Sequence, residues 1–254
     1  MSVPVPISAI VIASSEADSI EACLDTLAWC DECLVVDAFS RDGTSEATPD
    51  GTRLIERRFV DFPTQRQAAL QRAAYDWVIF VDADERVTDV LANEIGIRVG
   101  HEAHVAYSVP RRNRIFGHWM RGSGWAPDRQ FRVMDRRYMR FRTDRSVHEL
   151  IDVRGSVGEL KHSLAHYGYR TVREFRCRQR RYASMAVDDL YAAGIRRRRT
   201  ALVAQPLREI RRRLVEYRGY RDRWVGFQLA LLMAEHEWLV QRGLAQRWRR
   251  TLNH

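Results

Sequence analysis

The chain has 254 residues, 45% of them hydrophobic, and a formal net charge of +9 at pH 7. This length and apolar content exclude a disordered chain and suit one large domain, or one domain with a helical appendage. Lys161 is the only lysine, so arginine supplies nearly all of the basic excess. Because a guanidinium group binds oxyanions through paired hydrogen bonds, nucleotide phosphate, lipid phosphate and nucleic acid all remain candidate partners.

The four cysteines do not indicate a metal or redox site. Cys30 and Cys33 form a close pair, but no second pair and no histidine stands at the spacing of a zinc finger. We interpret them as small buried hydrophobic residues. The sequence shows no signal peptide and no uncharged run of spanning length, so we expect the protein on the cytoplasmic side of the membrane.

Short apolar runs rich in β-branched residues predict four buried strands in the first third of the chain. They cover residues 7–12, 33–37, 53–56 and 77–81. A helix is predicted after Ser19, which suits an N-cap, and another over residues 63–74, with Pro63 in its first turn. The alternation of strands and helices predicts an α/β fold with a mostly parallel sheet and right-handed crossovers.

Acidic residues follow three of these strands. Asp37 ends the second strand and Glu16 follows the first. The fourth strand runs into three acids, namely Asp82, Asp84 and Glu85. Taken alone, this last group fits either a site for a hard cation or an acidic turn before a helix capped by Thr88. Because the carboxyl ends of parallel strands meet at one edge of a sheet, the convergence of acids favours a ligand site there.

The pattern changes after a predicted helix at residues 88–99. Residues 104–110 are strand-like, and short strands of mixed direction are expected up to residue 167, extending the sheet. From residue 171 onward, helical periodicity predicts three helices. The first ends before Gly194, the second covers residues 202–217 with a break at Pro206, and the third covers residues 224–240.

Several segments, taken in order, carry a family resemblance. They are Ile-Val-Ile at 10–12, Val-Val-Asp-Ala-Phe-Ser-Arg-Asp-Gly-Thr at 35–44, Phe-Val-Asp-Ala-Asp-Glu at 80–85, Phe-Gly at 116–117, Gly-Trp-Ala-Pro-Asp at 124–128, Arg132, Val-His-Glu at 147–149 and His-Tyr-Gly-Tyr-Arg at 166–170. Together they resemble the family 2 glycosyltransferases of the GT-A fold, and within that family the branch of lipopolysaccharide-core glucosyltransferases. The resemblance implies a GT-A catalytic domain at 1–170 and an arginine-rich helical extension at 171–254. Within the domain, residues 1–100 would form the nucleotide-binding half and residues 101–170 the acceptor half.

The resemblance also implies an activity. It is the inverting transfer of a sugar from a nucleotide-diphosphate donor, with a UDP-sugar favoured, to a hydroxyl of a cell-envelope glycan or glycolipid. Asp37 would contact the uracil or ribose, Asp82 the ribose or a metal, and Asp84 would bind the metal that bridges the diphosphate. Oxygen ligands around a metal that carries phosphate suit Mg²⁺ or Mn²⁺.

One segment departs from the family pattern. The family usually has a Thr-Tyr-Asn-Glu-like segment after its first strand, where this chain has Ala-Ser-Ser-Glu at 13–16. Ser14, Glu16 and Ser40 are expected on the nucleotide-sugar side of the site. Because the aromatic residue and the asparagine are missing, we expect base stacking or nucleotide preference to differ.

Inverting transfer to a hydroxyl needs a general base within hydrogen-bond reach of the acceptor. Glu149 is our candidate because it occupies the family's Val-His-Glu position, and a surface glutamate is the alternative. Asp128 is the second candidate. Trp125 is expected as an apolar platform for a sugar face of the acceptor.

For the remaining candidate residues, a structural role explains the sequence about as well as a role in the site. His166, and with less support His148, could complete the metal shell, although a single histidine is more often structural. Arg132 could hold the diphosphate or lie solvated on the surface. Gln65 and Arg66 resemble the family's donor-side helix, but a polar helix face explains them equally well.

The C-terminal helices carry aromatic residues among their arginines, a pattern that suits a peripheral contact with an anionic membrane surface. Packing against the catalytic domain is the alternative for the apolar residues. Nucleic-acid binding is disfavoured because the arginines are scattered and no recognised motif is present. A nucleotidyltransferase, the second enzyme class, would need a glycine-rich basic loop after the first strand, which this chain lacks. An inactive transferase fold is a further alternative.

Overall fold

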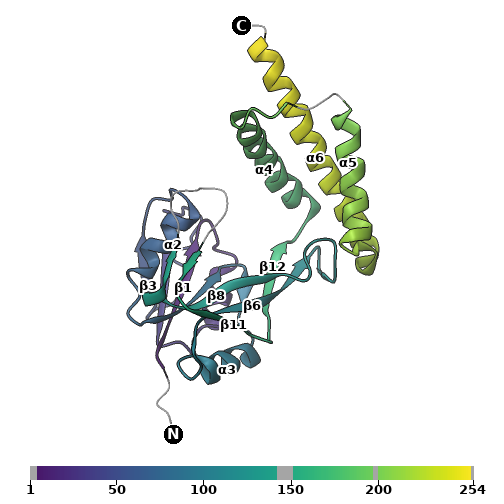
Figure 1. The fold of residues 1–254 in the computed structure, drawn as a ribbon. Helices are drawn as coiled ribbons and strands as arrows, with labels where there is room; N and C mark the ends of the chain where they lie inside the picture. The colour runs from purple at the N-terminus through teal and green to yellow at the C-terminus, as the bar shows by residue number, and fades with distance from the viewer. Residues whose placement is uncertain (1–4, 142–150, 197–199, 253–254) are drawn as a thin grey trace. The chain divides into compact units, whose positions relative to one another are not determined.

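The computed structural model describes residues 5–141, 151–196 and 200–252, and the chain forms two compact units (Figure 1). The first, here called the sheet unit, consists of Met1–Arg112 and Asp128–His166. The second, called the helical unit, consists of Asn113–Pro127 and Tyr167–His254. The division after His166 lies near residue 170, where the sequence places the start of the extension. Residues 113–127, expected in the acceptor half, group with the helices.

The sheet unit begins with four parallel strands at the predicted places. They are β1 (Ile7–Ala13), β2 (Glu32–Asp37), β3 (Arg53–Glu56) and β4 (Trp77–Asp82). Their order in the sheet is β3-β2-β1-β4, and each neighbouring pair is parallel. The prediction of a mostly parallel α/β sheet is confirmed for this part of the chain.

Strands of mixed direction extend the sheet beyond β4, as predicted. They are β5 (Glu85–Arg86), β6 (His104–Ile115), β7 (His118–Trp119), β8 (Arg129–Asp135), β11 (Ser156–Glu159) and β12 (Leu164–Tyr169). β8 is antiparallel to both β4 and β6, and the order continues through β12 to β5. After the short 3₁₀ turn η1 (Arg136–Tyr138), β9 (Met139–Phe141) forms a separate antiparallel pair with β10 (Ile151–Val153).

Helices cover both faces of the parallel strands. They are α1 (Ile20–Asp25), α2 (Phe62–Leu70) and α3 (Asp89–Arg98). Alternate residues of a strand point to opposite faces, so Val11 of β1 belongs to the core with α1 and α3, whereas Ile10 belongs to the core with α2. The predicted cap of α3 is confirmed, because the Thr88 hydroxyl accepts a hydrogen bond from the Leu91 amide.

α2 ends at Leu70, four residues before its predicted end at residue 74. The amide of Ala74 donates to the Glu32 carboxylate at 2.7 Å, and the amide of Tyr75 donates to the Ser8 hydroxyl at 3.1 Å. These side chains stand at the starts of β2 and β1. The hydrogen bonds that would have continued the helix are therefore used to turn the chain into β4.

The described residues of the helical unit form three helices, with two short irregular turns between the second and third. They are α4 (Val172–Ala192), α5 (Ala201–Arg211), the π-helical η2 (Arg212–Glu216), the 3₁₀ turn η3 (Gly219–Asp222) and α6 (Arg223–Leu252). The predicted break at Pro206 is wrong, because a proline in the second turn costs one hydrogen bond near the helix start and α5 tolerates it. α6 continues past its predicted end at residue 240, since Leu244 is still buried and arginines in the last turn suit the helix dipole. No helix among the described residues is long and apolar enough to cross a membrane.

Asp222 is the buried polar centre of the helical unit, with only 1% of its surface exposed. Its carboxylate accepts hydrogen bonds from the Arg121 amide at 2.6 Å and from the Ser123 hydroxyl at 2.9 Å. Nε2 of His118 lies 3.4 Å away. Since these three partners belong to the segment 113–127, Asp222 ties that segment to the turn before α6.

Candidate active site

The acids predicted at strand ends meet at one edge of the sheet. In the parallel register, Ala13 of β1 pairs with Asp37 of β2, and Ile12 pairs with Asp82 of β4. The carboxyl ends of the three strands therefore lie side by side, which is where open α/β sheets bind ligands. The predicted convergence of acids is confirmed by this register.

Two arginines hold Asp82. Its carboxylate forms ion pairs with Arg66, at 3.0 Å, and with Arg132. Burial raises the pKa of Asp82, but the positive charges of Arg132 and Arg66 outweigh burial and hold that pKa well below its usual value. Asp82 is therefore ionised at neutral pH, and its negative charge is already balanced.

Glu85 is fully buried between two arginines. Its Oε1 accepts hydrogen bonds from Arg132 at 2.7 Å and from Arg111 at 3.3 Å, and its Oε2 accepts one from the Asp82 amide at 3.0 Å. Burial lowers the pKa of Arg132, but the charges of Asp82 and Glu85 raise it well above the usual value. Arg132 is 2% exposed and serves these two carboxylates, so we assign it to them instead of to the expected diphosphate contact.

Asp84 pairs with a histidine and, among the described residues, forms no ion pair with an arginine. Its Oδ2 lies 3.2 Å from Nε2 of His166, which stands on β12 opposite Glu85 of β5. The Asp84 side chain is 23% exposed and that of His166 is 18% exposed, so solvent reaches both. The three acids of the motif therefore have two different environments.

Asp84 and His166 offer a carboxylate oxygen and an imidazole nitrogen, which suit Mn²⁺ and, for the oxygen, Mg²⁺. No group of three or more side chains within the described part of the chain could hold a metal by itself. Asp82 is a poor third ligand, because its oxygens face guanidinium groups that repel a cation. The pair fits a cation that takes two ligands from the protein and the others from water and a diphosphate.

The loops after β1 and β2 are tied together by hydrogen bonds. Asp37 is fully buried and accepts bonds from the Ser40 amide at 2.7 Å and from the Ser40 hydroxyl at 2.5 Å. The Ser15 amide donates to the Ser40 hydroxyl oxygen, and the Glu16 amide donates to the Thr44 hydroxyl. Of the residues expected on the nucleotide side, Ser14, Glu16 and Ser40 lie in these two joined loops, and Asp37 is the last residue of β2.

Gln65 and Arg66 of α2 lie in the interior of the sheet unit, which removes the surface helix face as their explanation. Gln65 is 1% exposed and donates to the Arg57 carbonyl at 3.2 Å. Arg66 is 8% exposed and reaches Asp82, with its guanidinium 5.7 Å from the centroid of the Phe80 ring. α2 therefore supplies one of the cations that neutralise the acidic motif.

Of the two candidate bases, the structure describes the surroundings of Asp128. Asp128 Oδ2 accepts a hydrogen bond from Nε of Arg111 at 2.7 Å, and its Oδ1 accepts one from Gln130 at 2.7 Å. Both carboxylate oxygens are therefore engaged within the protein. Glu149 and the neighbouring His148 lie outside the described residues.

Trp125 belongs to the helical unit, although the sequence places it in the acceptor half. Its ring lies 6.2 Å from that of Phe175, centroid to centroid, and the guanidinium of Arg213 lies 4.6 Å from its centroid. Arg213 also donates to the Ser123 carbonyl at 2.7 Å. One indole face is thus already covered by a cation from the helices.

Arg111 is a site residue that sequence reasoning missed, because it stands outside every motif. One feature of the sequence indicates that a cationic partner of this kind exists. Glu85 follows a buried strand, and a glutamate is almost never fully buried unless it is paired with a cation. The sequence could therefore indicate that a partner exists, but among so many arginines it does not indicate which one.

Comparison with known proteins decides the family. Residues 8–158 match the family described as Glycosyl transferase family 2, which is more than half of the chain. The chain belongs to this family. The expected enzyme class, a glycosyltransferase, is thereby confirmed, and the nucleotidyltransferase and nucleic-acid-binding alternatives are set aside.

The relatives of this transferase include one of similar length. The lipopolysaccharide core biosynthesis glycosyltransferase LpsC of Rhizobium meliloti (strain 1021) is 26% identical over 209 residues, which are 79% of this chain and 77% of LpsC. A TPR repeat-containing protein of Synechococcus elongatus is 28% identical over 149 residues, covering 58% of this chain but only 35% of that protein.

A solved structure confirms the fold. The mannosyltransferase PcManGT from Pyrobaculum calidifontis, in complex with GDP-Man and Mn²⁺, superposes with a TM-score of 0.52. It is 20% identical and covers 93% of this chain and 89% of its own. The predicted GT-A fold is therefore confirmed.

Proposed function

We propose that this transferase moves a sugar from a nucleoside-diphosphate donor to a hydroxyl of a cell-envelope glycan or glycolipid, with inversion at the anomeric carbon and with a divalent cation. One observation carries the proposal. Arginines neutralise Asp82 and Glu85 of the acidic motif, while Asp84 pairs with His166 and, in the part of the chain that the structure describes, with no arginine. The negative charge that remains is placed to attract a cation at the carboxyl end of β4.

Each named residue then has a task. Asp84 and His166 would hold Mn²⁺ or Mg²⁺, which when bound neutralises charge on the departing diphosphate. Asp37, the last residue of β2, would position the nucleoside. Asp82, fixed by its arginines, would accept a hydrogen bond from the ribose. Glu149 would take the proton of the acceptor hydroxyl.

The relatives support the chemical class of both substrates. LpsC is named as a lipopolysaccharide core glycosyltransferase, which supports a cell-envelope acceptor. The PcManGT structure is described with GDP-Man and Mn²⁺, which supports a nucleotide-sugar donor and a cation. The family resemblance favours a UDP-sugar.

Ligand-induced stabilisation tests the proposal directly. We expect Tm to rise with one of UDP, GDP or dTDP only when Mn²⁺ is present, because a ligand that binds the folded state alone stabilises it by mass action. Each nucleotide is also measured with EDTA, and Mn²⁺ alone serves as the control. A chain that responds to none of the three nucleotides would refute the proposed donor class.

The base assignment has its own test. Glu149→Gln keeps the size of the side chain but cannot accept a proton, so turnover should fall by roughly 100-fold or more while nucleotide affinity is retained. Asp128→Asn is the matched comparison. If Asp128→Asn loses turnover and Glu149→Gln does not, Asp128 is the base and the assignment is reversed.

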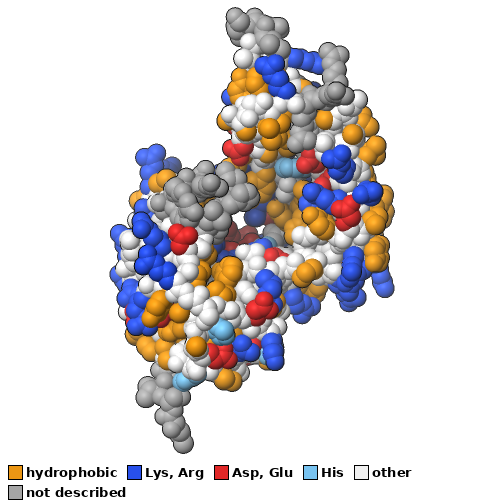
Figure 2. Space-filling model, in the orientation of Figure 1, with side chains coloured by type: hydrophobic (Ala, Val, Ile, Leu, Met, Phe, Trp, Pro, Cys, Tyr) orange, Lys and Arg blue, Asp and Glu red, His pale blue; other side chains and the backbone are white. Residues whose placement is uncertain are grey.

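We also propose that the helical unit contacts an anionic membrane surface. Residues 171–254 contain 20 arginines and 8 acidic residues, whereas residues 1–170 contain 22 basic and 25 acidic residues. The whole positive excess therefore lies in the C-terminal segment. Figure 2 shows basic and hydrophobic side chains interspersed over the visible face of the helical unit.

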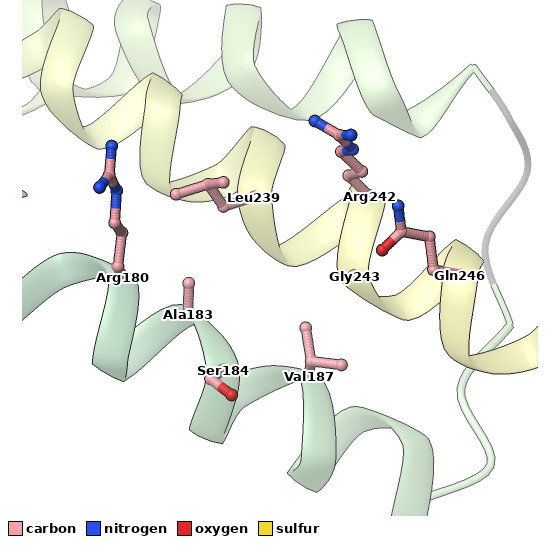
Figure 3. A pocket seen from close by; sticks show the side chains of 8 residues that line it. All are labelled: Arg180, Ala183, Ser184, Val187, Leu239, Arg242, Gly243 and Gln246. Carbon is pink, nitrogen blue, oxygen red and sulfur yellow. The ribbon is translucent and has the colours of Figure 1, made fainter.

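Two features of the helices suit lipid. α6 exposes apolar side chains at helical spacing, at Trp224, Phe227, Leu231 and Trp238. A groove of about 350 Å³ between α4 and α6 combines apolar side chains, among them Val187 and Leu239, with Arg180 and Arg242 (Figure 3). Arginine with exposed aromatic and aliphatic residues is the composition of helices that lie in the interface of anionic bilayers.

Vesicle sedimentation tests this contact. The protein should pellet with phosphatidylglycerol vesicles and be released by salt, because the attraction to anionic headgroups is screened. Phosphatidylcholine vesicles are the control. Equal pelleting with both vesicle types, or none with either, would contradict an electrostatic contact.

A further inference from the structure

Six charged side chains among the described residues of the sheet unit form one connected network, in which three carboxylates face three guanidinium groups. Its members are the carboxylates Asp82, Glu85 and Asp128 and the guanidinium groups Arg66, Arg111 and Arg132. The members come from α2, β4, β5, β6 and β8 and from the residue before β8, so the network joins segments distant in sequence. Asp84 is outside it and pairs with His166.

Glu85 is the branch point of this network. Through Arg132 it is joined to Asp82, since Arg132 Nη2 donates to both carboxylates. Through Arg111 it is joined to Asp128, since Arg111 donates from Nη1 to Glu85 and from Nε to Asp128. Its other oxygen accepts the Asp82 amide. The hydrogen bonds of Glu85 thus reach both the Arg132–Asp82 pair and the Arg111–Asp128 pair, here called the two arms of the network.

We propose that Glu85 is a positioning residue that sets the orientation of Asp82 through Arg132 and of Asp128 through Arg111. Asp82 is the last residue of β4, at the nucleotide edge of the sheet, and Asp128 ends the Gly-Trp-Ala-Pro-Asp segment assigned to the acceptor. Glu85 thereby links the donor side of the site to the acceptor side. The inference rests on the proposed function, because its main readout is sugar transfer.

The physical basis is the cost of breaking a buried ion pair. Removing the charge of Glu85 leaves the buried Arg132 and the partly buried Arg111 with one anionic partner fewer, so both can move to find new partners. Without the charge of Glu85, Arg132 and Arg111 each keep a single carboxylate and become available to another anion, such as a diphosphate. The attraction of these guanidinium groups for the diphosphate should offset the weakened ribose contact of Asp82, so donor affinity should change little, while Asp82 and Asp128 lose their fixed positions.

The decisive variants are Glu85→Gln, which keeps the size of the side chain, Arg111→Gln, and the two combined. For Glu85→Gln we expect the dissociation constant of the Mn²⁺–nucleoside diphosphate complex to stay within about threefold, and kcat for donor turnover to fall by about 100-fold, as displacement of positioned groups does. The double variant should be no worse than Glu85→Gln alone, because both substitutions cut the same link. Glu21→Gln, on the exposed face of α1, is the matched control.

The outcomes separate the inference from the proposed function. If the wild type binds a nucleoside diphosphate and turns over but Glu85→Gln keeps its kcat, Glu85 has no positioning role. If Glu85→Gln loses affinity and turnover in parallel with folded fraction, its role is only structural. If Glu85→Gln does not fold, Arg111→Gln carries the test, because Arg111 is 20% exposed and leaves the Arg132 arm intact. If the wild type binds no nucleoside diphosphate at all, the proposed function is refuted, and the positioning role of Glu85 is refuted with it.

Discussion

Each unit contains a buried carboxylate, and the two carboxylates have different kinds of partners. Glu85 in the sheet unit is 0% exposed and is met by two guanidinium groups. Asp222 in the helical unit is 1% exposed and is met by a backbone amide and a serine hydroxyl, with a histidine 3.4 Å away. The first carboxylate is balanced by full charges and the second by dipoles.

The different partners of the two carboxylates indicate different roles. Guanidinium groups are long and branched, so an ionic network can hold several functional side chains at once and pass a change from one to another. A hydrogen bond from a backbone amide, in contrast, fixes only the path of the main chain. We therefore expect substitutions around Glu85 to change function as well as stability, and substitutions at Asp222 to change stability.

Asp84, the acid that the ionic network leaves out, should show the largest functional effect. Asp84→Asn removes the negative charge beside His166, and we expect Mn²⁺-dependent nucleotide affinity to fall by roughly 100-fold or more, as for loss of a metal ligand. Isothermal calorimetry with and without Mn²⁺ measures it. Asp89→Asn, in the first turn of α3, is the control. Retained metal-dependent binding would place the cation elsewhere.

Asp222→Ala should lower stability markedly. The substitution leaves the Arg121 amide and the Ser123 hydroxyl without their acceptor in a buried position, which costs about 2–3 kcal/mol of unfolding free energy. Urea unfolding monitored by tryptophan fluorescence measures it, with the exposed Asp188→Ala as the control. A loss no greater than in Asp188→Ala would show that the buried carboxylate does not hold segment 113–127.

The ionic network should appear in the pH dependence of stability. The folded-state pKa of Asp82 lies below the value of about 3.9 in an unfolded chain, so the folded protein binds fewer protons near that pH. The contribution of Asp82 is thus fully present above about pH 4 to 5 and is lost as pH falls toward the folded-state pKa. Unfolding free energies of wild type and Asp82→Asn should differ at neutral pH and converge in acid. Parallel curves down to the acid limit would contradict the ion pairs.

The smallest expected effect concerns the arginines of the helical unit. Arg180→Gln and Arg242→Gln, at the groove between α4 and α6, should each weaken binding to phosphatidylglycerol vesicles by about fivefold, the usual contribution of one basic residue near an anionic surface. Donor turnover in solution should not change. Arg154→Gln, an exposed arginine of the sheet unit, should leave vesicle binding unchanged. Equal losses in all three would show that overall charge, and not this surface, drives the contact.

Much of the fold was predictable because it depends on local patterns. Apolar runs placed β1 to β4 within a residue or two, and the parallel arrangement then brought Asp37 and Asp82 to one edge. Predictions that depended on competition between local and distant contacts failed. α2 ends before residue 74, where Glu32 and Ser8 take the amides of Ala74 and Tyr75, and Pro206 does not break α5.

The sequence by itself determined the fold class, the family and the sheet edge that carries the acids, because strand ends follow from hydrophobic pattern and motif order. Only the tertiary structure decided what each acid contacts. Arg66, Arg111 and Arg132 come from α2, β6 and β8, and an ion pair depends on where distant segments meet in space. In a chain with so many arginines, packing decides which arginine meets which acid. As a result, arginines pair with Asp82 and Glu85, whereas Asp84 pairs with a histidine.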